Sequence, residues 1–382
     1  MAQARIPAVF YRGGTSKAVL FRRADLPADR ELCDKIFCHV IGSPDPYKRQ
    51  LDGMGGGLSS VSKVVIVEPS ARDDADVDYT FVQIAVDEPI ADYGSMCGNM
   101  SSSIGPFAVD EGWVQADGDE ASVRVYNTNA DALYTATFPV EDGQAIEVGD
   151  FEIPGVPGAG AKIKLDYFGL GGAITDALLP TGNVRDVLSV EGIGDIEVSM
   201  VDASNPVAFV RASDIGQTAL ESPFDLDADA ELMAKLDQIR RSASVAMGMS
   251  DTPETAILSN PKIAMLGKAG EFTALDGRTY SGDAYDIAVR IVSMGNVHRA
   301  VTLTGAMCLA TAVRIPGSIA NELARESGTT LVGNPSGLLP VEAEVRRSGN
   351  GFEAVSATTY RTQRRIMEGA VLVPEELAGH AS

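Results

Sequence analysis

Twice in this 382-residue chain, a strand-like segment runs into a turn of small residues and then into a short helix that is apolar on nearly all sides. The first copy includes the run Asp92–Ala108, which carries Cys97, and the second covers residues 302–313. A helix with so little polar surface must be buried, so each copy needs other elements around it. The pattern predicts two related halves, each with strands around one buried helix.

Length and composition agree with two folded domains. A chain of this length exceeds one ordinary core, and 45% hydrophobic with 22% charged residues is typical of a soluble globular protein. The net charge of −22 argues against binding to nucleic acid or to anionic membranes, because both need a basic surface. We therefore expect neither nucleic acid nor membrane as a partner.

The four cysteines and the N-terminus point to a reducing compartment. The cysteines form no Cys-x-x-Cys pair, which argues against structural zinc and disulfides. No export signal opens the sequence, and no apolar run reaches the ~18 residues of a membrane span. A cytoplasmic location is the expectation.

The remaining pattern supplies the other elements. A proline- and glycine-rich stretch, 153–183, is the best candidate for a crossing between domains. Amphipathic periodicity predicts helices over 29–41 and 227–247. Strands are expected at 6–21 with a glycine bend, and at 64–67, 77–86, 122–127, 133–140, 196–201, 286–293, 352–359 and 361–373.

Two positions carry candidate chemistry. Cys97 comes just before a helix, where free N–H groups and the helix dipole attract anions and lower the pKa of a thiol; the alternative is a small buried cysteine in a tight turn. Lys63 follows a glycine-rich loop and opens a strand. That loop lacks the spacing of a nucleotide-binding loop, and Lys63 could equally be an ordinary solvated lysine.

Together these pieces resemble the PrpF family of 2-methylaconitate isomerases and their relatives, from residue 5 to about 373. Two departures are Ala18, where a glycine is usual, and Gly94-Ser-Met before Cys97, where Gly-Asn is common. The matching motifs are Arg12-Gly-Gly-Thr-Ser-Lys17, Gly42-Ser-Pro-Asp-Pro46, Asp52-Gly-Met-Gly-Gly56, Ser62-Lys63, Cys97-Gly-Asn99, Gly105-Pro-Phe-Ala108, Leu179-Pro-Thr-Gly-Asn183, His298 and Ile315-Pro-Gly317.

The resemblance implies an α+β fold like that of diaminopimelate epimerase. Two pseudo-symmetric domains would each wrap a β-barrel-like sheet around a central helix, with the active site in the cleft between them. The N-terminal domain would comprise residues 1–187 and 362–382, and the C-terminal domain residues 188–361.

The resemblance also implies an activity: a cofactor-independent isomerase that shifts a double bond in a small unsaturated di- or tricarboxylate. Family substrates include 2-methylaconitate, aconitate, methylitaconate and 4-oxalomesaconate, and both allylic proton transfer and cis–trans isomerisation occur. Two alternatives stay open, an amino-acid epimerase of the same fold and a non-catalytic polycarboxylate binder. The turn at 302–305 lacks the second cysteine of diaminopimelate epimerase, which disfavours two-thiol racemisation. The oligomeric state is not fixed, and a homodimer is one option.

By the same resemblance, Lys63 and Cys97 match the catalytic lysine and cysteine of the family. No metal or cofactor is expected, since the helix N-termini and nearby polar groups would hold the carboxylates and the developing charge. The expected substrate-binding residues are Thr15, Ser16, Lys17, Gly98, Asn99, Met100, Asn205, His298, Thr304 and Gly305.

Overall fold

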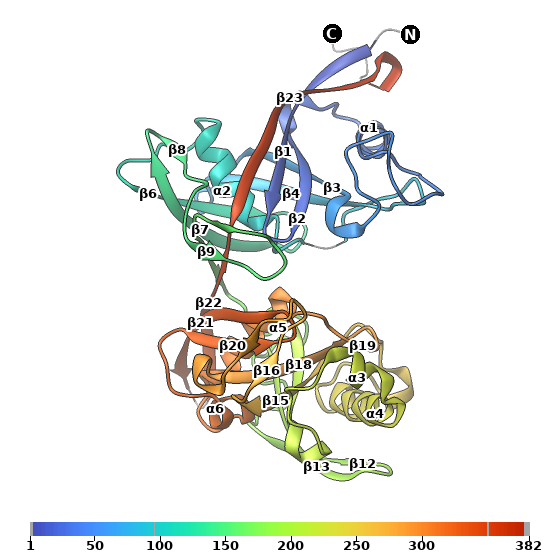
Figure 1. Cartoon of the computed structure of the whole chain (residues 1–382), viewed down its shortest axis with the longest axis vertical. Coiled ribbons are helices and arrows are strands. Elements are labelled where there is room, and N and C mark those ends of the chain that lie inside the picture. Colours follow the sequence, from blue (N-terminus) through green and yellow to red (C-terminus); the bar gives the residue numbers. More distant parts are fainter. Residues whose placement is uncertain (1–2, 95, 350, 378–382) are drawn as a thin grey trace. The chain divides into compact units, whose positions relative to one another are not determined.

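A computed structural model describes residues 3–94, 96–349 and 351–377. The chain divides into two compact units. Unit 1 holds the described residues up to Asp166 and from Tyr360 onward, and unit 2 is Tyr167–Thr359; the sequence suggested divisions after residues 187 and 361. Both units mix strands and helices, so the predicted α+β class is confirmed (Figure 1). None of the described helices has the length and apolar character needed to span a bilayer.

The described part of unit 1 is built mainly from strands, with two α-helices. Its helices are α1 (Arg30–Ile41) and α2 (Ser101–Asp110). Its strands are β1 (Gln3–Gly13), β2 (Ser16–Arg22), β3 (Lys63–Pro69), β4 (Val77–Ile84), β5 (Ala91–Asp92), β6 (Glu120–Asn127), β7 (Ala132–Glu141), β8 (Gln144–Ala145), β9 (Phe151–Glu152), β10 (Ala159–Gly160) and β23 (Gln363–Pro374), while β11 (Ile163–Phe168) crosses the boundary.

Helix α2 is the centre of unit 1. It packs against β1, β4, β6, β7, β8 and β23, and all residues from Ser101 to Val109 are buried. Buried tyrosines fix its first turn: the Tyr134 hydroxyl donates to the Ser101 carbonyl at 2.9 Å, and the Tyr79 hydroxyl lies 2.9 Å from the Ser101 hydroxyl. The predicted buried helix is therefore confirmed, and its polar N-terminal serines are hydrogen-bonded.

Among the described residues, unit 2 combines further strands of the large mixed sheet with four α-helices. The helices are α3 (Pro223–Ala228), α4 (Ala230–Ala246), α5 (Leu303–Val313) and α6 (Ile319–Leu323). The strands are β12 (Asp186–Val190), β13 (Gly194–Asp202), β14 (Pro206–Arg211), β15 (Lys262–Lys268), β16 (Phe272–Thr273), β17 (Thr279–Tyr280), β18 (Ile287–Ser293), β19 (Asn296–Val297), β20 (Thr330–Asn334), β21 (Gly337–Ser348) and β22 (Gly351–Arg361), the last crossing the boundary.

The strand pairings of the two units follow one scheme. In unit 1, β1–β2 is antiparallel, β2–β3 parallel, β3–β4 antiparallel, β4–β6 parallel and β6–β7 antiparallel. In unit 2, β13–β14, β14–β15, β15–β18, β18–β20 and β20–β21 repeat that order. Helix α5 is buried from Gly305 to Val313 and packs on β13, β14 and β21. The predicted duplication is thus present in the topology as well as in the helices.

One predicted helix is wrong in its bounds. The amphipathic pattern over 227–247 predicts a single helix, but the chain forms α3 and then α4, with the break at Asp229. The Asp229 carboxylate accepts the Leu232 N–H at 3.0 Å and caps α4, because an N-cap side chain satisfies a helix N–H that has no carbonyl partner. The apolar face of α4 is buried as predicted, including Leu236 and Ile239.

Candidate active site

The glycine hairpin between β1 and β2 lies directly against the turn that precedes α2. A Cβ atom on Gly13 would stand 2.6 Å from the Asn99 carbonyl oxygen, and one on Gly14 would stand 2.4 Å from Asn99 Oδ1. Gly14 also has φ of +51°, a conformation that favours glycine. The two glycines are therefore needed for the close approach of the hairpin to Asn99.

Asn99 joins three elements of unit 1. Its Nδ2 group donates to Thr15 Oγ1 at 3.0 Å and more weakly to Ser16 Oγ at 3.4 Å. Its Oδ1 atom accepts from the Nε group of the buried Arg361 at 3.3 Å. The structure thus brings together three of the predicted binding residues, and adds Arg361, which the sequence did not indicate.

The turn at Cys97 leaves backbone donors available at the start of α2. The Ser101 N–H donates to the Cys97 carbonyl at 3.1 Å. This bond extends the helical hydrogen-bond pattern of α2 by one turn towards the N-terminus. Among the residues that the structure describes, the N–H groups of Gly98, Asn99 and Met100 have no protein acceptor. Such N–H groups at the positive end of a helix form a site suited to a carboxylate.

Lys63 is the first residue of β3 and only 7% exposed. Its Nζ atom donates to Gln83 Oε1 at 2.5 Å and lies 5.0 Å from the centroid of the Phe81 ring. The Gln83 amide is oriented by its own donation to the Ser62 carbonyl at 2.9 Å. Burial lowers the pKa of Lys63, and the electrostatic effect of Cys97 opposes that change in part. A lowered pKa makes the neutral amine, which is the basic form, more accessible.

The glycine-rich loop before Lys63 is held by one buried glutamine. Gln50, 1% exposed, donates from Nε2 to Ser43 Oγ at 2.8 Å. Its Oε1 atom accepts from the Gly57 N–H at 2.8 Å and from Ser62 Oγ at 2.7 Å. Gln50 therefore links the loop to the residue that immediately precedes Lys63.

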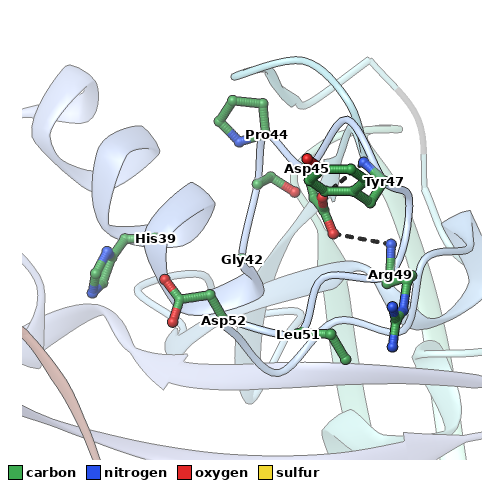
Figure 2. A pocket seen from close by; sticks show the side chains of 9 residues that line it. His39, Gly42, Pro44, Asp45, Tyr47, Arg49, Leu51 and Asp52 are labelled. Atoms are coloured by element: carbon green, nitrogen blue, oxygen red, sulfur yellow. Dashed lines mark hydrogen bonds between the residues drawn. The ribbon is translucent and has the colours of Figure 1, made fainter.

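The turn at residues 42–52 and His39 of α1 form a surface hollow of about 310 Å³ (Figure 2). Its wall is stiffened by Asp45, whose carboxylate accepts backbone N–H groups of Tyr47 at 2.8 Å and of Arg49 at 3.0 Å. Lys63 and Cys97 do not line this hollow. The lining residues are His39, Gly42, Ser43, Pro44, Asp45, Tyr47, Arg49, Leu51 and Asp52.

Lys17 lies apart from the Asn99 group. It pairs with Arg12 in the β1–β2 ladder, and its Nζ atom is 5.4 Å from the centroid of the Phe10 ring. Because successive side chains of a strand point to opposite faces, Lys17 points away from the face on which Ser16 meets Asn99.

Unit 2 contains a second lysine in a polar pocket of amides. Lys262, the first residue of β15, donates from Nζ to Asn205 Oδ1 at 2.9 Å and lies 3.5 Å from Asn260 Oδ1. The Asn205 amide in turn donates to Asn260 Oδ1 at 2.9 Å. Burial lowers the pKa of Lys262. Sequence reasoning chose Asn205 and missed Lys262, although a lysine that opens an apolar strand also marks Lys63.

His298 lies within the electrostatic range of Lys262. Its ring nitrogen Nδ1 lies within hydrogen-bonding distance of the Ala300 carbonyl and 3.2 Å from the Ala300 nitrogen. Partial desolvation of the ring lowers the pKa of His298, and the positive charges of Lys262 and Arg299 lower it further. The imidazole is therefore biased towards its neutral form.

The start of α5 differs chemically from the start of α2. Thr302 caps α5 by accepting the Gly305 N–H at 3.1 Å, so this donor is occupied, while Thr304 lies in the first turn. The thiol in unit 2, Cys308, is completely buried, donates to the Val201 carbonyl at 3.3 Å and has a pKa raised far above the ordinary value by burial. Within residues 3–94, 96–349 and 351–377, no three histidine, cysteine or acidic side chains gather as a metal ion would require.

The duplicated fold around two buried helices, with a buried lysine in the electrostatic range of Cys97, is accompanied by a match to isomerases along almost the whole chain. A model of the PrpF protein family matches residues 3–374, and the chain belongs to this family.

Similar proteins cover almost the whole chain. The chain is 42% identical over 378 residues to the 3-methylitaconate isomerase of Eubacterium barkeri, covering 97% of this chain and 98% of that protein. It is 37% identical to the 2-methyl-aconitate isomerase of Cupriavidus necator, covering 97% and 98%, and 37% identical to the 4-oxalomesaconate tautomerase of Pseudomonas putida, covering 99% of each. A crystal structure of a methylitaconate-delta-isomerase matches with a TM-score of 0.92 and 41% identity, covering 100% of this chain and 99% of that one.

Proposed function

We propose that this enzyme shifts a double bond in a small unsaturated di- or tricarboxylate, such as 2-methylaconitate, aconitate, methylitaconate or 4-oxalomesaconate. The observation that carries the proposal is Lys63, a buried amine with a lowered pKa in the electrostatic range of Cys97. The names of the full-length relatives support the same substrate class.

The first step is removal of a proton from the carbon next to the double bond. Such a carbon acid is weak, so the reaction needs a positioned base and stabilisation of the resulting dienolate. The neutral amine of Lys63 takes the proton and becomes an ammonium, while the electron pair moves into the conjugated system and onto a carboxylate.

The second step returns a proton to the far end of the three-carbon unit. The Cys97 thiol gives this proton, the double bond forms at its new position, and the Lys63 ammonium then protonates the Cys97 thiolate. The net change in the enzyme is zero, so no external acid or base is consumed. In a cis–trans reaction, the delocalised anion rotates about the bond that has lost double-bond character before it is protonated again.

The substrate carboxylates need donors that are present before reaction. In unit 1 we assign this role to the N–H groups of Gly98, Asn99 and Met100, which have no acceptor among the described residues, and to the hydroxyls of Thr15 and Ser16. In unit 2 we assign it to Asn205, His298 and the first turn of α5 at Thr304. Because Thr302 occupies the Gly305 N–H, Gly305 contributes space rather than a hydrogen bond.

The two alternatives make different predictions. An amino-acid epimerase with two thiols needs a second accessible cysteine, and Cys308 is completely buried and bonded to a backbone carbonyl. A non-catalytic binder would hold polycarboxylates without exchanging hydrogen at carbon. Exchange at carbon therefore separates the isomerase from the binder.

The test is incubation with cis- and trans-aconitate, 2-methylaconitate, methylitaconate and 4-oxalomesaconate in D2O, followed by NMR. We expect one of them to isomerise and gain deuterium, and we expect Lys63→Ala and Cys97→Ala to abolish isomerisation. The exposed Lys35 gives a matched control, because Lys35→Ala should keep full activity. The isomerase assignment fails if no substrate reacts or exchanges, and the base assignment fails if Lys63→Ala stays active.

We also infer that the enzyme works in the cytoplasm, because its four cysteines are all free thiols and free thiols persist in reducing compartments. A homodimer is the assembly to test first, and light scattering of the purified chain measures it directly.

A further inference from the structure

The duplication places Lys63 and Lys262 at the same position of the two units. Each is the first residue of a strand, β3 or β15, that pairs in parallel with the strand before it, β2 or β14. Each is also desolvated. The proposed mechanism uses Lys63 and leaves Lys262 without a role.

The surroundings of Lys262 contain oxygen acceptors but no counter-charge. Its Nζ atom contacts the side-chain oxygens of Asn205 and Asn260 and, at 3.5 Å, the Ser259 carbonyl. Among the residues that the structure describes, no carboxylate lies within ion-pair distance of it. An ammonium removed from water without a negative partner is costly. In a chain of net charge −22, such a group is well suited to receive an anion.

Lys262 cannot repeat the proton chemistry proposed for Lys63. The thiol near it, Cys308, is completely buried and its proton is directed to the Val201 carbonyl, whereas Cys97 is partly exposed. Lys63, for its part, must be neutral to act as a base, so it cannot balance the charge of an incoming carboxylate. A cation other than Lys63 would therefore add to the N–H groups that hold the substrate carboxylates.

We propose that Lys262 is a substrate-binding residue whose ammonium pairs with one carboxylate of the polycarboxylate, held in position by the Asn205 and Asn260 amides. The ligand class rests on the proposed function. Lys262 thereby selects for a substrate with a carboxylate at one defined position, and it takes no part in moving protons at carbon.

The test measures binding instead of turnover. Isothermal titration calorimetry of the full chain would use propane-1,2,3-tricarboxylate and the two dicarboxylates that lack one of its carboxylates, glutarate and methylsuccinate. None of them has a double bond, so none can react. Lys262→Met should weaken binding of the tricarboxylate by about 10- to 100-fold, the usual size of a lost hydrogen bond to a charged group.

Two variants and one comparison between ligands keep the result specific. Lys268 lies at the exposed end of the same strand, so Lys268→Met should bind like the wild type. Lys262→Arg should retain most of the affinity, because the charge is kept. One of the two dicarboxylates, glutarate or methylsuccinate, lacks the carboxylate that pairs with Lys262. That ligand should bind to Lys262→Met and to the wild type equally well.

Three outcomes would overturn the proposal. Unchanged tricarboxylate affinity in Lys262→Met, with an unfolding midpoint equal to wild type, excludes the contact. If Lys262→Met weakens the binding of all three ligands equally, Lys262 attracts anions only through a nonspecific electrostatic effect and pairs with no particular carboxylate. If Lys262→Met binds substrate as tightly as the wild type but no longer exchanges hydrogen at the substrate carbon when saturated, Lys262 takes part in proton transfer. Tight binding of these ligands by an enzyme that isomerises nothing would remove the proposed function while leaving the role of Lys262 standing.

Discussion

Lys63 and Gln83 face each other across the β3–β4 ladder, where the lysine ammonium donates to an amide oxygen that is itself oriented by the backbone. The partner of the ammonium is thus neutral. An amide stabilises the charged lysine less than a carboxylate would. The pKa of Lys63 therefore stays lowered by burial. The identity of residue 83 should therefore control the basicity of Lys63.

Gln83→Glu should slow the enzyme by raising the pKa of Lys63. With Lys63 as the base, kcat/KM of the wild type should rise with pH, with a midpoint below the ordinary lysine value of 10.5. A carboxylate at residue 83 stabilises the ammonium, so the midpoint should move to higher pH. The rate at pH 7.5 should then fall about tenfold for every pH unit that the midpoint rises.

The measurement is a pH profile of kcat/KM for the wild type and Gln83→Glu. Gln144→Glu, at an exposed position, adds the same charge and should leave the profile unchanged. A shared profile for wild type and Gln83→Glu would contradict the prediction.

Gly13→Ala should damage the Asn99 turn. The added methyl group would stand 2.6 Å from the Asn99 carbonyl oxygen, so the hairpin or the turn must move, at a cost of about 1–3 kcal/mol. Urea unfolding gives the change in free energy, and substrate affinity reports the displaced N–H groups. Gly369 lies in β23, and no atom of the described residues would come within 4 Å of a Cβ there, so Gly369→Ala is the matched control. Equal stability of the two variants would show that the hairpin tolerates the methyl group.

Gln50→Ala should destabilise the loop that ends at Lys63. The substitution removes the acceptor of the Gly57 N–H and the Ser62 hydroxyl and the donor to Ser43. Buried polar groups left without partners cost about 1–3 kcal/mol. Chemical denaturation measures this loss, with the exposed Gln144→Ala as control. A change below about 0.5 kcal/mol, the size of an ordinary surface substitution, would mean that the glycines alone hold the loop.

Glu322 should stabilise unit 2 in a pH-dependent manner. Its carboxylate receives hydrogen bonds from Arg211 at 2.9 and 2.8 Å and from Arg185 at 2.5 Å. These lower the pKa of Glu322 to about 2 from 4.5. Because the pKa in the folded state is the lower one, the stabilisation is complete above pH 4.5 and is lost as the pH falls from there towards 2. Glu322→Gln should therefore reduce Tm at pH 7, and the difference from wild type should shrink below pH 4.5.

The measurement is thermal unfolding of both proteins across the pH range in which the wild type stays folded. The exposed Glu326→Gln provides the control for the charge change. A difference in Tm that stays constant down to pH 3 would contradict a role for the Glu322 carboxylate.

Much of the fold follows from patterns that act over a few residues. The apolar helix α2, the hairpin at Gly13 and the duplication were predictable because small or apolar residues leave few alternatives at those positions. The break at Asp229 was not, because one carboxylate that caps α4 interrupts a periodic pattern that continues through it. The role of a glycine in the loop before Lys63 was not predictable either: Gly53 serves close backbone packing, since a Cβ there would stand 2.2 Å from the Gly42 nitrogen.

The candidate site was predictable only in part. Thr15, Ser16 and Asn99 do lie together, whereas Lys17 does not join them. Gln83 escaped notice because its partnership with Lys63 depends on strand register, which no local pattern records. Lys262 could have been found by aligning the two halves strand by strand, since it opens β15 as Lys63 opens β3.

The distribution of thiols has a practical consequence. Cys33, Cys38 and Cys308 are buried and burial raises their pKa values, while Cys97 is partly exposed. The thiolate is the form of cysteine that reacts with alkylating reagents. Burial therefore protects three of the four cysteines, and Cys97 is the cysteine that we expect to be alkylated in the folded enzyme. Under the proposed mechanism, one equivalent of iodoacetamide would mark the partly exposed Cys97 and inactivate the molecule that it marks. The amount of reagent taken up would then count functional enzyme in any preparation, without knowledge of the substrate.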